Sequence, residues 1–110
     1  MTTTIKRIAL FGSTGSIGKQ ALEVIAAHPD KFSVEILTAN NNADTLVEQA
    51  LQFQPNIVVI GEEEKYLKVN EALSGTGIKV FAGEKVEYEL QLSIPDLPEW
   101  VQVNYMPVKD

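Results

Sequence analysis

Three glycines at three-residue spacing, Gly12, Gly15 and Gly18, follow a continuous apolar run at residues 8–11. Such a run is typical of a strand buried on both faces, and the residues after Gly15 have the pattern of a helix that begins there. A strand, a glycine-rich turn and a helix in this order bring free backbone N–H groups and the positive end of a helix dipole to one point. The segment therefore predicts a phosphate-binding turn in an α/β protein, with an ordinary βα turn that binds nothing as the alternative.

Each glycine of this segment has a separate expected role. Gly12 and Gly15 lack a Cβ, so they can adopt positive φ and let the main chain approach a pyrophosphate, while Gly18 lets the helix pack tightly against the strand. The spacing is Gly-x-x-Gly-x-x-Gly, which differs from the dinucleotide fingerprint Gly-x-Gly-x-x-Gly and does not by itself choose the ligand. The sequence has no Gly-Lys-Ser or Gly-Lys-Thr, so nothing supports nucleoside triphosphate hydrolysis.

The composition limits the other possibilities. With 110 residues, 45% of them hydrophobic and 22% charged, the chain is expected to form one domain of ordinary cytoplasmic type, too short for a complete two-halved dinucleotide fold. Its polar first residues and its lack of long apolar runs predict neither a targeting segment nor a membrane span. The net charge of −6 argues against nucleic acid as a partner, although a local helix dipole can still hold an anionic cofactor.

Metal and nucleophile chemistry have few candidates in this sequence. It has no cysteine, which removes disulfides, thiolate nucleophiles and thiolate metal ligands. Its one histidine, His28, precedes Pro29 and is expected to end the first helix rather than to act as a ligand or catalyst. Glu62, Glu63 and Glu64 are interpreted as acids that stabilise the start of a helix, because adjacent helical residues point in different directions around the axis. We therefore assign no catalytic residue and no metal ligand.

Strand-like and helix-like segments alternate through most of the chain, which predicts βαβ units. The expected fold class is α/β, a Rossmann-like parallel sheet with about four βα units. Asn42 is expected to cap the second helix. In the first helix, a stripe of apolar residues is expected to pack on the sheet. These residues are Ile17, Ala21, Val24 and Ile25, and His28 lies at the end of the same stripe. The expected strands cover residues 8–11, 32–37, 56–60 and 78–81, and the expected helices cover residues 16–27, 43–54 and 62–73.

The pattern changes near the C-terminus. Over residues 86–94 apolar and polar side chains alternate strictly, a turn follows at residues 95–98, and residues 100–106 again resemble a strand. A C-terminal antiparallel β-hairpin is the expected structure, so that residues 84–110 extend the domain formed by residues 1–83. Two roles are open for this hairpin: it closes the edge of the same sheet, or it pairs with a second copy and gives a homodimer.

The residues around the glycine segment resemble one known family. GSTGSIG at residues 12–18 is followed by HPDKF at 28–32, LTANN at 37–41 and FQP at 53–55, and the similarity ends near GIKVFAG at 77–83. This combination closely resembles the amino-terminal domain of 1-deoxy-D-xylulose 5-phosphate reductoisomerase over about 83 of the 110 positions. It is much narrower than a generic glycine-rich βα turn.

The resemblance implies the NADPH-binding part of an enzyme of non-mevalonate isoprenoid biosynthesis. That enzyme isomerises a sugar phosphate and reduces it to 2-C-methyl-D-erythritol 4-phosphate, with a divalent metal, Mg or Mn, bound in its catalytic domain. The matching residues are expected to bind the cofactor pyrophosphate at the glycine turn, and the ribose with its 2′-phosphate after the second strand. They are Gly12, Ser13, Thr14, Gly15, Ser16 and Ile17 at the turn, and Asn40, Asn41 and Asn42, the asparagine triplet, after the strand.

The asparagine triplet departs from the family, which commonly has a glycine, a basic residue and an asparagine at these positions. Asn40 is expected to replace the glycine because asparagine adopts left-handed backbone more readily than most residues. Asn41 lacks the charge-assisted contact to the 2′-phosphate, which weakens the expected preference for NADP over NAD. No acid ends the second strand, where a carboxylate would bind the ribose 2′-OH, so NADP(H) is still the expected cofactor.

The resemblance stops before the catalytic domain of the family, and the segment after Gly83 has no recognised counterpart in it. The chain is therefore expected to be a cofactor-binding fragment that is inactive alone, because reduction needs a substrate site and isomerisation needs a metal. The alternative is a stand-alone nucleotide-binding or self-associating α/β module that uses its C-terminal hairpin.

Overall fold

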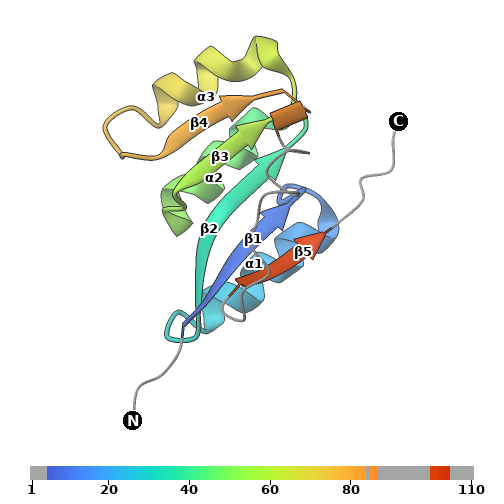
Figure 1. Cartoon of the computed structure of the whole chain (residues 1–110), viewed down its shortest axis with the longest axis vertical. Coiled ribbons are helices and arrows are strands. Elements are labelled where there is room, and N and C mark those ends of the chain that lie inside the picture. The colour runs from blue at the N-terminus through green and yellow to red at the C-terminus, as the bar shows by residue number, and fades with distance from the viewer. Residues whose placement is uncertain (1–4, 84, 87–99, 105–110) are drawn as a thin grey trace.

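The computed structural model describes residues 5–83, 85–86 and 100–104 of the chain, and its strands form one parallel sheet (Figure 1). The strands are β1 (Lys6–Phe11), β2 (Phe32–Ala39), β3 (Ile57–Ile60), β4 (Lys79–Ala82) and β5 (Trp100–Asn104). The helices are α1 (Ser16–Ala27), α2 (Ala43–Phe53), the short 3₁₀ helix η1 (Glu63–Lys65) and α3 (Tyr66–Ala72). The predicted α/β fold, with a parallel sheet and interleaved helices, is confirmed.

The strand order places the first strand inside the sheet. In the order β4-β3-β2-β1-β5, successive crossovers carry the chain from β1 to β4 in one direction, and the chain then returns to the other side of β1. Leu10 of β1 is opposite Leu37 of β2 on one side and Val103 of β5 on the other. This reversal is a topological switch point, and open parallel sheets bind their ligands beyond the carboxyl ends of the strands at such a point.

Helices α1, α2 and α3 lie on one face of the sheet and build the main core with it (Figure 1). Leu10, Leu37, Leu46 and Val69, from two strands and two helices, are fully buried. The opposite face carries a smaller cluster of Ala9, Phe11 and Ile36. Burial on both faces explains why the apolar run of β1 is continuous rather than alternating.

Helix α1 packs on the sheet through a different stripe from the predicted one. Gly18, Leu22 and Ile25 are buried, whereas the exposed fractions of Ile17 and Val24 are 52% and 55%. Gly18 determines which face of α1 is turned toward the sheet, because the turn before α1 can approach the helix only where a side chain is missing. Leu22 and Ile25 then follow on the same face, four and seven residues later. The prediction that Ile17 and Val24 face the sheet is wrong.

The C-terminal strand is present, but its pairing differs from the predicted antiparallel hairpin. β5 runs parallel to β1, with Val101 opposite Ile8. Residues 85 and 86 are helical, so the predicted first arm does not begin as a strand at residue 86. The rest of that arm, residues 87–94, and the predicted turn at 95–98 lie outside the described residues. Alternating side chains suit a strand in either direction, and a parallel partner needs a long crossover, which the stretch between β4 and β5 is long enough to provide.

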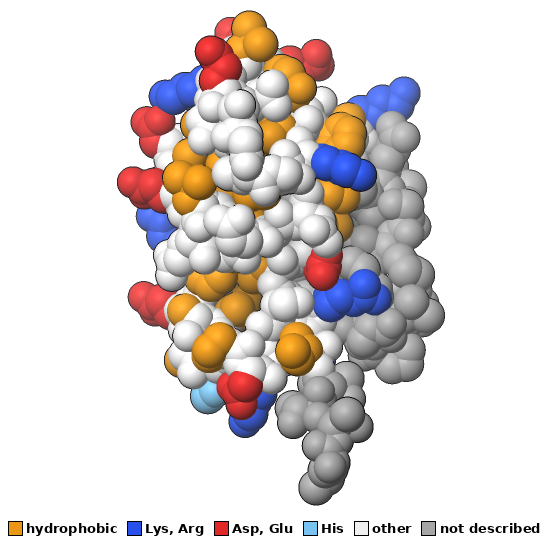
Figure 2. All heavy atoms as spheres, turned by 90° about the vertical axis from the view of Figure 1, so that its left-hand side faces the viewer, with side chains coloured by type: hydrophobic (Ala, Val, Ile, Leu, Met, Phe, Trp, Pro, Cys, Tyr) orange, Lys and Arg blue, Asp and Glu red, His pale blue; other side chains and the backbone are white. Residues whose placement is uncertain are grey.

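The surface carries charges of both signs. Figure 2 shows basic and acidic side chains interspersed with hydrophobic patches on one face of the molecule. The described side chains on that face form no extended basic surface of the kind that binds nucleic acid. Among the helices in the described ranges, none is long and apolar enough to cross a membrane.

Candidate functional site

The glycine-rich turn between β1 and α1 is anchored to the end of β2. Gly12 has a φ of 83°, a left-handed conformation that favours glycine, whereas Gly15 has a φ of −78° and does not use the positive φ expected there. Its N–H donates to the Thr38 carbonyl at 3.1 Å and to Thr38 Oγ1 at 3.0 Å. The Ser13 N–H donates to the same carbonyl at 2.8 Å. Because Thr38 is fully buried, these bonds fix the point at which the chain leaves the sheet.

Gly18 lets the first turn of α1 lie directly against this loop. A Cβ on Gly18 would stand 2.4 Å from the Gly12 carbonyl oxygen and 2.7 Å from the Ser13 carbonyl oxygen. Both oxygens belong to the backbone, so they cannot move aside as the end of a flexible side chain could. A close backbone approach at the third glycine is present, but it is to the turn at Gly12 and Ser13 and not, as predicted, to the strand.

Ser13 and Gln49 form a buried polar pair that joins the turn to α2. Ser13 Oγ lies 2.7 Å from Gln49 Oε1, and Gln49 Nε2 donates to the Ser13 carbonyl at 2.9 Å. Ser13 is fully buried and Gln49 is 8% exposed. Ser13 is among the predicted cofactor-binding residues, but its N–H and hydroxyl are both bonded within the protein, so it holds the loop. Gln49 is a site residue that we did not predict; its signal is a polar side chain within the buried stripe of α2, between Leu46 and Ala50.

The outward side of the turn presents the remaining predicted residues. Thr14 and Gly15 are partly exposed, and Ser16 and Ile17 are exposed on the first turn of α1. The first α-helical bond after the N-cap runs from the Lys19 N–H to the Gly15 carbonyl at 2.8 Å, so the three preceding N–H groups of α1 have no α-helical acceptor. With the helix dipole, they form an open positive end that suits an anion.

The asparagine triplet follows β2, and all three of its side chains are exposed. Asn42 Oδ1 accepts from the Thr45 N–H at 3.3 Å, which confirms the predicted cap of α2. The Asn40 carbonyl accepts from the Glu62 N–H at 2.8 Å, which ties the triplet to the chain after β3. In the described ranges Gln54 is the one non-glycine residue with positive φ, so Asn40 occupies its position without the left-handed backbone we expected.

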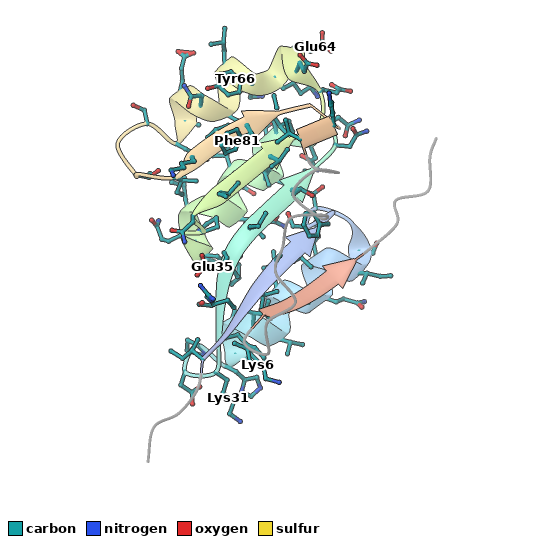
Figure 3. All side chains as sticks on the ribbon, viewed as in Figure 1. Lys6, Lys31, Glu35, Glu64, Tyr66 and Phe81 are labelled. Carbon is teal, nitrogen blue, oxygen red and sulfur yellow. The ribbon has the colours of Figure 1, made fainter. Side chains whose placement is uncertain are left out.

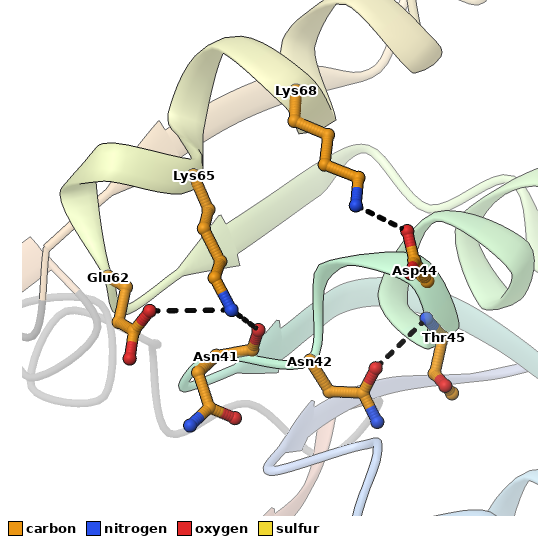
Figure 4. Close-up of polar contacts among 7 residues, drawn as sticks. All are labelled: Asn41, Asn42, Asp44, Thr45, Glu62, Lys65 and Lys68. Carbon is orange, nitrogen blue, oxygen red and sulfur yellow. Dashed lines mark hydrogen bonds and ion pairs between the residues drawn. The ribbon is translucent and has the colours of Figure 1, made fainter.

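A lysine from η1 reaches the triplet. Lys65 Nζ donates to the Asn41 carbonyl at 2.7 Å and lies 3.4 Å from Glu62 Oε2 (Figure 4). Beside this contact, Lys68 Nζ lies 2.7 Å from Asp44 Oδ1 and joins α3 to α2. The hydrogen bond from Lys68, and then its charge, lower the pKa of the Asp44 carboxyl. Charged groups of both signs therefore surround a triplet that is itself uncharged. We did not predict Lys65 as a site residue, because no local pattern links η1 to the end of β2.

The acidic residues that the structure describes do not gather into a metal site. No group of three or more His, Asp or Glu side chains in these ranges could hold a metal ion. In the acidic run expected to begin a helix, Glu63 and Glu64 lie in the first turn of η1, whereas Glu62 is its N-cap residue and makes no side-chain hydrogen bond to the backbone. Glu62 pairs with Lys65 instead.

These features define a class of protein. A parallel sheet with a glycine-rich β1–α1 turn at its switch point, an open helix N-terminus and a polar segment after β2 is the arrangement of a Rossmann-type nucleotide-binding domain. The family model described as 1-deoxy-D-xylulose 5-phosphate reductoisomerase matches residues 8–94. The chain belongs to this family, as the sequence resemblance predicts. The match continues past Gly83, where we expected the resemblance to end.

Individual relatives carry the same family name. The 1-deoxy-D-xylulose 5-phosphate reductoisomerase of Phocaeicola vulgatus is 62% identical over 78 residues, which are 71% of this chain and 20% of that protein. That of Bacteroides fragilis is 48% identical over 105 residues, which are 94% of this chain and 27% of that protein. The chain therefore spans about a fifth to a quarter of the length of these relatives.

Solved structures of the family share the fold. The reductoisomerase from Zymomonas mobilis in complex with NADPH has a TM-score of 0.78 at 29% identity, covering 84% of this chain and 24% of that one. A reductoisomerase in complex with magnesium has a TM-score of 0.70 at 26% identity, covering 78% of this chain and 22% of that one. Both likenesses confirm the Rossmann-like α/β architecture.

Proposed function

We propose that this chain is the NADPH-binding part of a 1-deoxy-D-xylulose 5-phosphate reductoisomerase. The observation that carries the proposal is the open N-terminus of α1 at the sheet's switch point, where residues 14–17 surround N–H groups without an α-helical acceptor. Membership of the family and the NADPH complex of the Zymomonas mobilis relative support it.

The turn fits the pyrophosphate of such a cofactor. The N–H groups of Ser16, Ile17 and Gly18 would donate to phosphate oxygens, and Gly15 has no side chain to obstruct their approach. The hydroxyls of Thr14 and Ser16 are further donors on the same side. Gly12 and Ser13 would support the site without touching the phosphate, because their hydrogen bonds to Thr38 and Gln49 hold the loop in place.

The segment after β2 fits the ribose end of the cofactor. β1 and β2 are neighbours with Phe11 opposite Thr38, so the turn and the asparagine triplet leave the sheet side by side. The residues after the second strand of such domains recognise the ribose 2′ position. Amide groups of Asn40 and Asn41 would donate to a 2′-phosphate. Asn42 Oδ1 is used by the helix cap, which leaves the NH₂ of its amide as the donor.

Bound NADPH would supply the hydride, and the residues of this chain would bind and orient it. For the whole protein we propose isomerisation and NADPH-dependent reduction to 2-C-methyl-D-erythritol 4-phosphate in non-mevalonate isoprenoid biosynthesis. We place the substrate site and the divalent metal, Mg or Mn, in the part of the relatives that this chain does not span. The chain alone is then expected to bind NADPH without turning over substrate.

Calorimetric titration of the chain with NADPH and NADH tests this proposal. We expect saturable heat with NADPH and a rise in thermal midpoint, because a ligand that binds only the folded state stabilises it. The absence of both signals with both nucleotides would contradict the proposal. ATP is the control ligand: a general nucleotide-binding module would bind it as well as NADPH.

The remaining expectations stay predictions. The charge of −6 supports the expectation that nucleic acid is not a partner, and the ordinary composition supports a cytoplasmic location. β5 belongs to the same sheet as the other strands, which supports treating residues 84–110 as an extension of the domain. Most of the segment to which we assign the homodimer, residues 87–99 and 105–110, lies outside the described residues. Light scattering measures it directly: the mass of a dimer would support the homodimer, and a monomer at all concentrations would contradict it.

A further inference from the structure

Lys65 brings a positive charge to the segment that follows β2. It ends η1, which follows β3, and β3 pairs with β2. Its ammonium donates to the Asn41 carbonyl at 2.7 Å and lies 3.4 Å from Glu62 Oε2 (Figure 4). The Lys65 side chain is 39% exposed, so its ammonium is held against the triplet and is still accessible from solvent.

The neighbouring lysine is less available for a ligand. Lys68 Nζ lies 2.7 Å from Asp44 Oδ1, and this hydrogen bond is the main reason why the pKa of Asp44 is lowered. The acidic partner of Lys65, Glu62, is more distant, and the short hydrogen bond of Lys65 is to the neutral Asn41 carbonyl. An ammonium has three N–H donors, so these two contacts leave one free.

A 2′-phosphate needs a cation that the strand end itself does not provide. A phosphate monoester carries about −1.5 to −2 charges near neutral pH. Residues 37–42 are all uncharged. Domains of this class accommodate the 2′-phosphate with a basic side chain near the end of the second strand. Lys65 is a basic side chain at that place, supplied by another part of the chain.

We propose that Lys65 is the residue that selects NADPH over NADH in this chain, through pairing of its ammonium with the 2′-phosphate. This inference rests on the proposed function, since it names the group that recognises one part of that cofactor. Glu62 modulates the contact: its carboxylate holds Lys65 in the free protein and repels an incoming phosphate. Exposed ion pairs are weak, so the phosphate displaces Glu62.

Titrations with 2′,5′-ADP and 5′-AMP test the inference, because these probes differ only in the 2′-phosphate. In Lys65→Met, affinity for 2′,5′-ADP is expected to fall about tenfold or more, as for the loss of a charge-assisted hydrogen bond, with 5′-AMP unchanged. Lys65→Arg should retain most of the preference. Lys31→Met is the matched control, because Lys31 lies at the opposite end of the sheet (Figure 3), and it should change neither affinity.

The outcomes separate this inference from the proposed function. An unchanged preference for 2′,5′-ADP in Lys65→Met overturns the inference and leaves NADPH binding intact. Equal weakening of both probes also overturns it, because Lys65 then acts on the fold. If the unaltered chain binds neither NADPH nor NADH, the proposed function fails and the inference fails with it.

A second variant covers the case in which Lys65→Met does not fold. Glu62→Gln is expected to tighten 2′,5′-ADP and to leave 5′-AMP unchanged, because the neutral amide neither pairs with the Lys65 ammonium nor repels the 2′-phosphate. Phosphorus NMR of the bound probe gives a readout that a structural role would not move: the ammonium should lower the pKa of the 2′-phosphate, and Glu62→Gln should lower it further. A bound 2′-phosphate with an unshifted pKa would overturn the inference.

Discussion

Gln49 and Ser13 exchange hydrogen bonds between α2 and the β1–α1 turn: Gln49 Nε2 is 2.9 Å from the Ser13 carbonyl, and Ser13 Oγ is 2.7 Å from Gln49 Oε1. The turn therefore belongs to the packed interior of the domain on one side and faces solvent on the other. Within the described residues, no buried side-chain nitrogen or oxygen lacks a hydrogen-bond partner. Because an unpaired buried polar group is costly, α2 helps to determine the shape of the β1–α1 turn.

Replacing Gln49 tests this dependence. Gln49→Met keeps the side chain's length but removes the donor to the Ser13 carbonyl and leaves the Ser13 hydroxyl with only the Thr38 carbonyl, at 3.3 Å, as acceptor. The free energy of unfolding is expected to fall by about 1–3 kcal/mol, and the affinity for NADPH should fall with it. Urea denaturation and calorimetry measure the two effects. Gln52→Met, at an exposed position of the same helix, is the control. Equal losses in both variants would show that the buried pair has no special role.

Gly18→Ala is expected to destabilise the protein, although replacing glycine by alanine in a helix usually stabilises it. In an exposed helix, replacing glycine by alanine stabilises by about 1 kcal/mol. Here the new Cβ would stand 2.4 Å from the Gly12 carbonyl oxygen, so a loss of about 1–3 kcal/mol is expected from overpacking. Denaturant unfolding measures the sign. Ala26→Gly, the opposite change at an exposed position of α1, gives the ordinary propensity effect. A stabilised Gly18→Ala variant would refute the close approach.

Gly15→Val separates binding from folding. Gly15 has a φ of −78° and a ψ of 173°, which any residue adopts, so the fold should be preserved. The new side chain would occupy the space over the helix N-terminus, and NADPH binding should be lost. Thermal unfolding checks the first expectation and calorimetry the second. Normal NADPH affinity in the folded variant would exclude this turn as the pyrophosphate site.

Asn41→Lys should strengthen NADPH binding selectively. The new ammonium would add a charge-assisted contact at the place where the family commonly has a basic residue. In a Lys65→Met background, the same change should restore the preference for NADPH. Competition between NADPH and NADH measures the ratio. Equal strengthening of both nucleotides would indicate that the 2′-phosphate is recognised elsewhere.

The contact between Asp44 and Lys68 predicts a dependence of stability on pH. Lys68 lowers the pKa of the folded Asp44 carboxyl, so the contact stabilises the protein above the ordinary titration range of an aspartate. That stability is lost as the pH falls through the lowered pKa. Carbon NMR of the carboxyl should show the low pKa, and Lys68→Met should move it up toward the ordinary value. Lys31→Met should leave it unchanged. An Asp44 pKa that does not respond to Lys68→Met would contradict the contact.

Local elements could be predicted because they depend on neighbouring residues. α1 begins at Ser16 and ends at Ala27, as the spacing of its residues predicts, and Asn42 caps α2 as predicted. The rotation of α1 could also have been predicted from Gly18 rather than from its apolar residues, because a close backbone approach fixes the buried face more strictly than hydrophobicity does.

Contacts between distant segments could not be predicted in this way. Alternating side chains in β5 fit a parallel or an antiparallel partner equally well, so the pattern does not reveal pairing with β1. The contacts of Ser13 with Gln49 and of Asn41 with Lys65 depend on the order of strands and on where each following helix begins. These contacts of the site therefore come from tertiary structure, whereas its glycine-rich turn is visible in a single short segment.

The position of β1 between β2 and β5 has a consequence for synthesis on the ribosome. β1 leaves the exit tunnel first and can pair with β2 once residues 32–39 have followed it. The other edge of β1 can pair with β5 only after residues 100–104 have also left the tunnel. An unpaired apolar edge can join strands of other nascent chains. A translation product that stops before residue 100 would keep this edge of β1 unpaired with β5, so we expect it to bind chaperones more than the product that includes β5.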